Sequence, residues 1–86
     1  MHKIWYDKAW EDYLYWQTQD KKTLKRVNQL IRDIERNNDL GLGKPELLHG
    51  NLSGFKSRRI NETDRLVYRV VKDTIEIASC KGHYDS

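Results

Sequence analysis

The chain has 86 residues, and 16 Lys and Arg stand against 13 Asp and Glu, which gives a formal net charge of +3 at pH 7. This length fits one domain over residues 1–86 and excludes a nucleotide-binding domain joined to a separate substrate domain. The aromatic content of 10% favours a folded chain over a disordered one. The single cysteine, Cys80, excludes an internal disulfide, and no apolar run reaches the ~20 residues that cross a bilayer. We therefore expect a cytoplasmic protein that makes no membrane contact.

The N-terminal half predicts a short strand and a first helix. Residues 3–6 are apolar and aromatic, as in a strand, and Asp7 stands in the position of a helix N-cap. Beyond it, apolar residues recur at a spacing of three to four, which predicts one buried helix face made of Tyr6, Trp10, Tyr13 and Leu14.

A second helix is predicted directly after the first. Its apolar stripe is continuous and consists of Leu24, Val27, Leu30, Ile31 and Ile34. Asp20 precedes this stripe in the capping position. The Asn- and Gly-rich segment 37–43 ends the helix, and Pro45 indicates a loop.

After residue 45 the apolar period changes from 3.6 to 2, which predicts strands at 55–60, 65–71 and 74–80. Alternation along 65–71 turns Leu66, Tyr68 and Val70 to the core and presents Arg65 and Arg69 on the other face. The predicted fold class is α+β, with two N-terminal helices packed on one face of a small, twisted, mainly antiparallel sheet.

Basic residues gather in the C-terminal half. Residues 1–43 hold eight basic and seven acidic side chains, whereas residues 44–84 hold eight and five. The cluster in the predicted strands consists of Lys56, Arg58, Arg59, Arg65 and Arg69. The planar fork of arginine donates two hydrogen bonds to one phosphate, so the cluster suits a polyanion. A solvated sheet face guarded by charge is the alternative.

Three further residues can move protons. Glu46 follows Pro45 and suits a general base, while His83 and Tyr84 close the chain and suit proton donors. Taken singly, each is equally consistent with an ordinary surface loop or a frayed tail. Cys80 and His83 are three residues apart, but the four ligands of a zinc site are lacking, so we expect no metal and no cofactor. As a set, a carboxylate, several arginines, a histidine and a tyrosine suit RNA cleavage by the ribose 2′-hydroxyl.

Several segments of the chain resemble the YoeB toxins within the RelE/ParE group of bacterial type II toxin–antitoxin systems. The resemblance runs from residue 3 to residue 84. Its most specific segments are Asn51-Leu52-Ser53-Gly54-Phe55 and Arg65-Leu66-Val67-Tyr68, together with Gly43-Lys44-Pro45-Glu46 and the closing His83-Tyr84.

This resemblance implies a microbial-ribonuclease-like fold and a ribosome-dependent endoribonuclease that cuts mRNA in the A site. It also implies an antitoxin encoded beside the toxin and a homodimer. Glu46 matches the general base, Arg65 the residue that stabilises the scissile phosphate, and His83 and Tyr84 the C-terminal catalytic pair. Of this pair, His83 is our choice for the general acid.

Further RNA contacts are expected at Lys44, His49, Lys56, Arg58 and Arg59, of which Arg59 matches a supporting phosphate contact. The family usually has a lysine at the position of His49, so the positive field there should be weaker. The alternatives that remain are a non-catalytic nucleic-acid-binding protein, a gyrase-targeting member of the group, and a structural domain with a charged surface.

Overall fold

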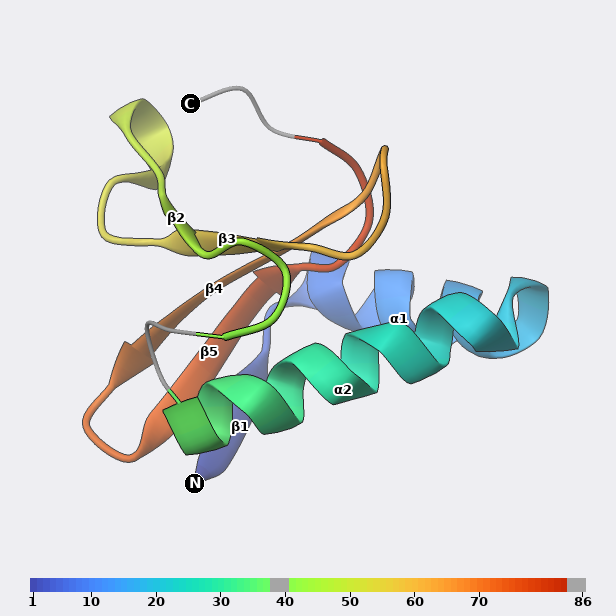
Figure 1. Cartoon of the computed structure of the whole chain (residues 1–86), viewed down its shortest axis with the longest axis horizontal. Coiled ribbons are helices and arrows are strands. Elements are labelled where there is room, and N and C mark those ends of the chain that lie inside the picture. Colours follow the sequence, from blue (N-terminus) through green and yellow to red (C-terminus); the bar gives the residue numbers. More distant parts are fainter. Residues whose placement is uncertain (38–40, 84–86) are drawn as a thin grey trace.

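Two helices cover one face of a five-stranded sheet in a computed structural model of the chain, which describes residues 1–37 and 41–83 (Figure 1). In chain order the elements are β1 (His2–Trp5), α1 (Asp7–Gln19), α2 (Lys21–Asn37), β2 (Glu46–Leu47), the 3-10 helix η1 (Gly50–Leu52), β3 (Lys56–Arg59), β4 (Arg65–Val71) and β5 (Thr74–Ser79). Within the described ranges, no helix is long and apolar enough to cross a membrane.

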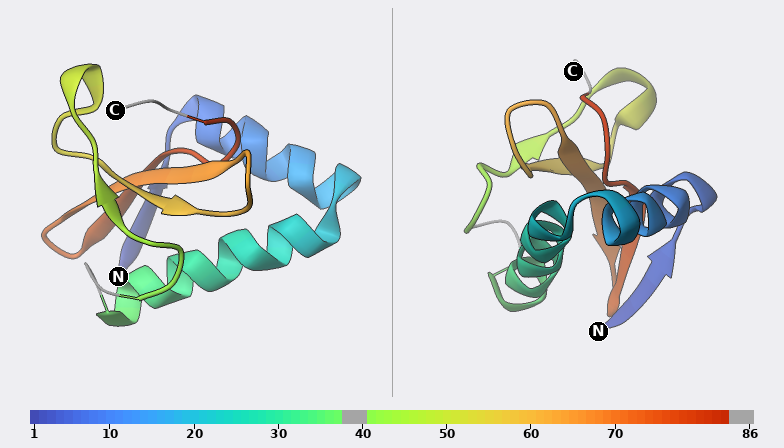
Figure 2. Two further views of the ribbon diagram at one scale, coloured as in Figure 1. Left: turned by 45° about the horizontal axis from the view of Figure 1, so that its top comes forward. Right: turned by 90° about the vertical axis from the view of Figure 1, so that its right-hand side faces the viewer.

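The strands lie in the order β1-β5-β4-β3-β2. The four strands from β2 to β5 form an antiparallel meander, and β1 adds to β5 in parallel. The segment between β1 and β2 crosses from one edge of the sheet to the other and contains both helices, and α1 and α2 lie on the same face of the sheet (Figure 2). The predicted α+β class is therefore confirmed, with β2 and η1 as elements that the sequence did not reveal.

Helix α2 forms as its sequence predicts. The carboxylate of Asp20 accepts hydrogen bonds from the backbone N–H of Thr23 at 3.1 Å and from its hydroxyl at 2.7 Å. The first bond satisfies one free N–H of the first turn, and the two bonds together lower the pKa of Asp20. The predicted stripe is buried at Val27, Leu30, Ile31 and Ile34, and Leu24 packs against the core.

The predicted buried face of α1 is wrong. Trp10 and Leu14 are exposed, and the buried residues are Ala9, Asp12 and Trp16, with Tyr13 packed beside them. The N-cap is Tyr6 rather than Asp7, and no side chain caps this end. The rotation of the helix is fixed by hydrogen bonds to the end of β5, which a local apolar pattern does not report.

These bonds meet at the backbone of Cys80. The carboxylate of Asp12 accepts from its N–H at 3.0 Å, and the indole N–H of Trp16 donates to its carbonyl at 2.9 Å. Lys8 pairs with Asp12 at 2.8 Å and donates to the carbonyl of Lys81 at 3.1 Å. Helix α1 thus holds the segment that follows β5.

A buried ion pair joins α2 to β3. The guanidinium of Arg58 has no exposed surface and donates to Asp33 at 2.5 Å, to the carbonyl of Leu42 at 2.9 Å and to the hydroxyl of Tyr68 at 3.2 Å. The backbone N–H of Leu42 donates to the same carboxylate at 3.0 Å. The hydrogen bond from Arg58 is the main cause that lowers the pKa of Asp33. The pair therefore fixes both the strand and the loop at residue 42.

We predict that Asp33→Ala destabilises the fold by about 3–5 kcal/mol, because it leaves the buried Arg58 without its counter-charge. The pKa of Asp33 is lower in the folded chain than in the unfolded one, so its contribution is complete above its unfolded value of about 3.9 and is lost as the pH falls through the native pKa. Urea unfolding of wild type and Asp33→Asn between pH 2 and 7 should show a smaller loss of stability below pH 4 in the variant. Glu62→Gln, at an exposed position, is the control.

We predict that the thiol of Cys80 is inert in the native protein. Burial raises its pKa to about 12, and its sulfur has no exposed surface and lies 3.7 Å from the carbonyl oxygen of Ala9. Only the thiolate reacts with alkylating agents. Iodoacetamide should therefore modify Cys80 slowly at pH 8 and rapidly in denaturant, as followed by intact mass. Rapid modification of the native chain would contradict this account.

Candidate functional site

One row of residues crosses the meander and defines the face on which the predicted site residues lie. Glu46 is opposite Ser57, and Ser57 is opposite Val67. Directly opposed residues in a sheet point to the same face. Leu66 and Tyr68, which alternate with Val67, belong to the core under the helices. Glu46 therefore points to the face away from the helices, which we call the open face.

The two predicted phosphate contacts of β3 and β4 lie on the same face. Arg59 is opposite Arg65, and each is two residues along its strand from the row of Ser57 and Val67. Across two strands and two residues, the Cα atoms of Glu46 and Arg65 are about 12 Å apart. Side chains as long as glutamate and arginine can span such a gap with one phosphodiester between them, and in this structure the guanidinium of Arg65 donates to the carbonyls of Asn61 and Asp64.

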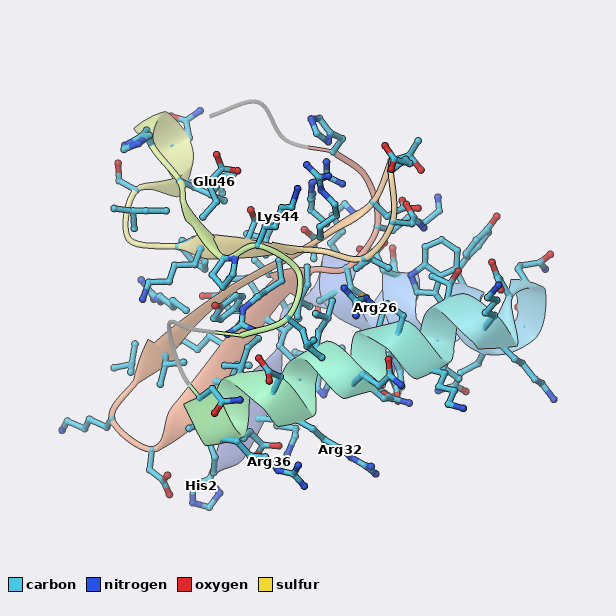
Figure 3. The ribbon with its side chains drawn as sticks, in the orientation of Figure 1. His2, Arg26, Arg32, Arg36, Lys44 and Glu46 are labelled. Atoms are coloured by element: carbon cyan, nitrogen blue, oxygen red, sulfur yellow. The ribbon has the colours of Figure 1, made fainter. Side chains whose placement is uncertain are left out.

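The loop before β2 supplies a further positively charged side chain, that of Lys44. Gly43 accepts a hydrogen bond from the backbone N–H of Arg59 at 2.6 Å, which holds the loop on the edge of β3. Lys44 follows with a positive φ of 51° and an exposed side chain. Figure 3 shows Lys44 and Glu46 together, well separated from Arg32 and Arg36 on α2.

The C-terminal segment reaches the same end of β4. The backbone N–H of Arg65 donates to the carbonyl of Gly82 at 2.8 Å, so His83 follows directly after a residue bonded to the first residue of β4. His83 is exposed. Tyr84, predicted as the other member of the catalytic pair, lies outside the described residues. The fold thus brings Glu46, Arg59 and Arg65 to one face of the sheet and the residue before His83 to the end of β4 where Arg65 lies, although they come from three separate parts of the chain.

Two predicted RNA contacts are not on this face. Lys56 is opposite Tyr68 and so belongs to the helix side of the sheet. Arg58 is fully buried in its pair with Asp33, and the prediction that it contacts phosphate is wrong. Neighbouring residues of a strand point to opposite faces, so Arg58 and Arg59 cannot both reach one ligand. His49 is exposed and precedes η1, beyond the end of β2.

Arg69 shares the open face but is engaged elsewhere. It donates to Glu76 at 2.8 Å, and its guanidinium lies 4.8 Å from the centre of the Phe55 ring. The hydroxyl of Tyr6 donates to the same carboxylate at 2.7 Å, and this bond is the main cause that lowers the pKa of Glu76. This cluster neutralises the far end of the open face and leaves Arg59 and Arg65 as its basic end.

Sequence reasoning missed the residues that hold the C-terminal segment. Asp12 and Trp16 bind the backbone of Cys80, a contact that the sequence pattern does not predict. Asp64 accepts a hydrogen bond from the N–H of Gly82 at 2.9 Å, which the local sequence around Asp64 does not indicate. The spacing of four between Lys8 and Asp12 was an available signal, since such pairs interact on a helix.

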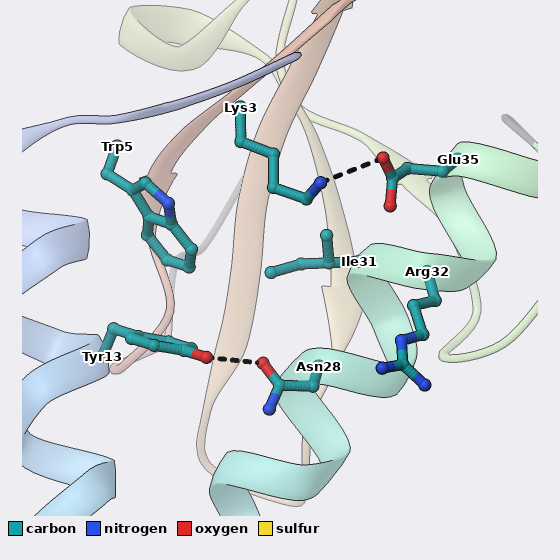
Figure 4. A pocket seen from close by; sticks show the side chains of 7 residues that line it. All are labelled: Lys3, Trp5, Tyr13, Asn28, Ile31, Arg32 and Glu35. Atoms are coloured by element: carbon teal, nitrogen blue, oxygen red, sulfur yellow. Dashed lines mark hydrogen bonds and ion pairs between the residues drawn. The ribbon is translucent and has the colours of Figure 1, made fainter. Parts of the chain in front are cut away.

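The hollows on the helix side lie apart from this site. One of about 360 Å³ lies between β1, α1 and α2, where Lys3 pairs with Glu35 and the hydroxyl of Tyr13 donates to Asn28 (Figure 4). Another of about 450 Å³ lies between α2 and Leu42 and is lined by Arg26, Arg32 and Arg36. Neither contains Glu46, Arg65 or His83.

Comparison with known proteins matches residues 5–84 to the family described as YoeB-like toxin of bacterial type II toxin–antitoxin system. The chain is 54% identical to Toxin YoeB of Escherichia coli K12 over 84 residues, which is 98% of this chain and 100% of that protein. It is 51% identical to Toxin YoeB of Streptomyces coelicolor over 76 residues, which is 88% of this chain and 90% of that protein.

Solved structures give the same picture. A YoeB/ParE toxin from Agrobacterium tumefaciens superposes with a TM-score of 0.94 at 41% identity, over 98% of this chain and 100% of that one. The YoeB chain of a YoeB–YefM complex and a YoeB dimer, both from Staphylococcus aureus, give TM-scores of 0.91 and 0.92 at 48% and 49% identity, each over 98% of both chains. At 17% identity, YafQ of Escherichia coli shares the fold, with a TM-score of 0.77 over 94% of this chain and 91% of that one.

Proposed function

Because this chain belongs to the YoeB-like family of toxins from bacterial type II toxin–antitoxin systems, we propose that it cleaves mRNA in the A site of the ribosome. The observation that carries the proposal is the alignment of Glu46, Arg59 and Arg65 on the open face, beside the segment that leads to His83. Cleavage there would stop translation, and its place of action is the cytoplasm, where ribosomes and mRNA meet.

The reaction we propose is attack of a ribose 2′-hydroxyl on the adjacent phosphorus. Glu46 takes the proton of the 2′-hydroxyl as the bond from this oxygen to phosphorus forms. Arg65 balances the charge that develops on the phosphoryl oxygens, supported by Arg59 and Lys44. The bond from phosphorus to the 5′-oxygen breaks, and the C-terminal pair His83 and Tyr84 supplies the proton for that oxygen. The products are a 2′,3′-cyclic phosphate and a 5′-hydroxyl.

Two protein partners complete the proposal. A YoeB from Staphylococcus aureus is known in complex with YefM and as a dimer. For this chain we infer an antitoxin with an acidic segment, since Arg59, Arg65 and Lys44 form a basic end on the open face that a disordered acidic chain can cover by folding on it.

For the homodimer, the exposed part of α1 offers a contact. Trp10 and Leu14 are four residues apart on this helix, so they project from neighbouring turns, and they are 47% and 43% exposed. A large aromatic side chain that packs at an interface contributes strongly to association.

We predict that Arg65→Ala lowers cleavage by a hundredfold or more, which corresponds to about 3 kcal/mol of transition-state stabilisation. Glu46→Gln removes the base and should cost about 10²- to 10⁴-fold. Primer extension on mRNA bound to programmed ribosomes measures both.

Arg69→Ala removes the same charge from the same face without touching the proposed site, so it serves as the matched control. If Glu46→Gln and Arg65→Ala cut as the wild type does, the mechanism is wrong. If the wild type leaves ribosome-bound mRNA intact but inhibits gyrase, the gyrase-targeting alternative holds instead.

We also predict that Trp10→Glu converts a dimer to a monomer, because it places a charge in an apolar contact. Sedimentation velocity measures the change, with Lys21→Glu on exposed α2 surface as the control. If Trp10→Glu is still a dimer, the interface does not lie on this part of α1.

A further inference from the structure

The turn between β3 and β4 is built from hydrogen bonds that converge on its first and last residues. The side-chain oxygen of Asn61 accepts from the backbone N–H of Thr63 and of Asp64, both at 2.8 Å. The carbonyl of Asp64 accepts from the N–H of Ile60 at 3.0 Å, which closes the turn. A turn with this many internal bonds offers a defined frame for the residue that follows it.

That following residue is Arg65, and the turn holds its side chain as well as its backbone. The guanidinium donates through Nη1 to the carbonyl of Asn61 at 2.7 Å and to that of Asp64 at 3.1 Å. Both acceptors are neutral, so the positive charge of Arg65 is oriented without being cancelled by a carboxylate.

The same turn binds the C-terminal segment at two points. Oδ1 of Asp64 accepts from the N–H of Gly82 at 2.9 Å, and the carbonyl of Gly82 accepts from the N–H of Arg65 at 2.8 Å. Gly82 has a φ of +101°, a backbone conformation that favours glycine, so the chain changes direction there. Asp64 therefore helps to set the direction in which the backbone runs from Gly82 into His83.

We propose that Asp64 is a positioning residue that sets the proton donor at the C-terminus against the phosphate-binding Arg65. Its carbonyl orients the guanidinium, while its carboxylate fixes the residue before His83. This inference rests on the proposed function, because the positions of Arg65 and His83 matter to a reaction only if both residues act in it.

The α1 contacts cannot take over this task. Lys8, Asp12 and Trp16 bind the backbone at Cys80 and Lys81, which lie before the turn in the chain at Gly82. The backbone of Gly82 is instead bonded to Asp64 and Arg65, through its N–H and its carbonyl respectively. Loss of the carboxylate removes the bond to the N–H of Gly82, so it should change the direction in which the backbone enters His83 and leave residues 80–81 in place.

The test compares Asp64→Ala with Asp64→Asn, whose amide oxygen can still accept from Gly82, and with Glu62→Ala, an exposed residue of the same turn. In single-turnover cleavage on programmed ribosomes, Asp64→Ala should lower the rate at saturation by about 10- to 100-fold, since small misplacement of a reacting group has costs of this size. The concentration of the protein at which the cleavage rate is half of its maximum should change less than twofold. Asp64→Asn and Glu62→Ala should remain within threefold of the wild type.

A second readout is independent of activity. The ¹⁵N heteronuclear NOE of the His83 amide should fall in Asp64→Ala and recover in Asp64→Asn, while that of Cys80 stays at the wild-type value. The proposal is overturned if folded Asp64→Ala cleaves at the wild-type rate at saturation. It is also overturned if the NOE of the His83 amide is unchanged in this variant. A wild-type protein that does not cut mRNA overturns the proposed function instead, and the NOE then still decides whether Asp64 holds the segment.

Discussion

The buried pair of Arg58 and Asp33 is the constraint on which the candidate base depends. Strand β2 has only two residues and cannot hold Glu46 by itself. The loop before it is fixed because both members of the pair bind the backbone of Leu42, and because Gly43 is bonded to β3. A Cβ atom at Gly43 would lie 3.0 Å from the backbone of Arg59, so glycine permits this close approach. The ion pair of Arg58 and Asp33, on the helix side of the sheet, thereby helps to position the carboxylate of Glu46 on the open face.

Elements whose pattern is local could be predicted from the sequence. Helix α2 has a cap, a continuous stripe and a Gly-rich end, and the hairpin of β4 and β5 alternates around a tight turn. The face of α1 could not be predicted in this way, because its rotation is set by Asp12 and Trp16, which bind the backbone of Cys80 more than sixty residues away. An aspartate in a helix suggests solvent, yet here it satisfies a buried N–H.

In the candidate site, too, only the features with a local sequence pattern could be predicted. Alternation in β4 gave the outward direction of Arg65 correctly. The same rule applied to β3 puts Lys56 and Arg58 on one face and Arg59 on the other, so the predicted basic cluster does not form one surface. The sequence contains no sign of β2, whose two residues pair with the edge of β3, so the local pattern gives Glu46 as a possible base but not its place on the sheet.

The three parts of the site are held in different ways, and this determines which part can be disturbed alone. Arg65 begins the seven-residue strand β4, which has partners on both sides and forms the fixed frame. Glu46 depends on a loop secured by a buried pair, so moving it requires opening the core. The segment that leads to His83 is held by hydrogen bonds to the backbone of residues 80–82, and those at Gly82 come from the turn between β3 and β4. The segment before His83 is therefore the part of the candidate site whose bonds to the turn can be broken without opening the core.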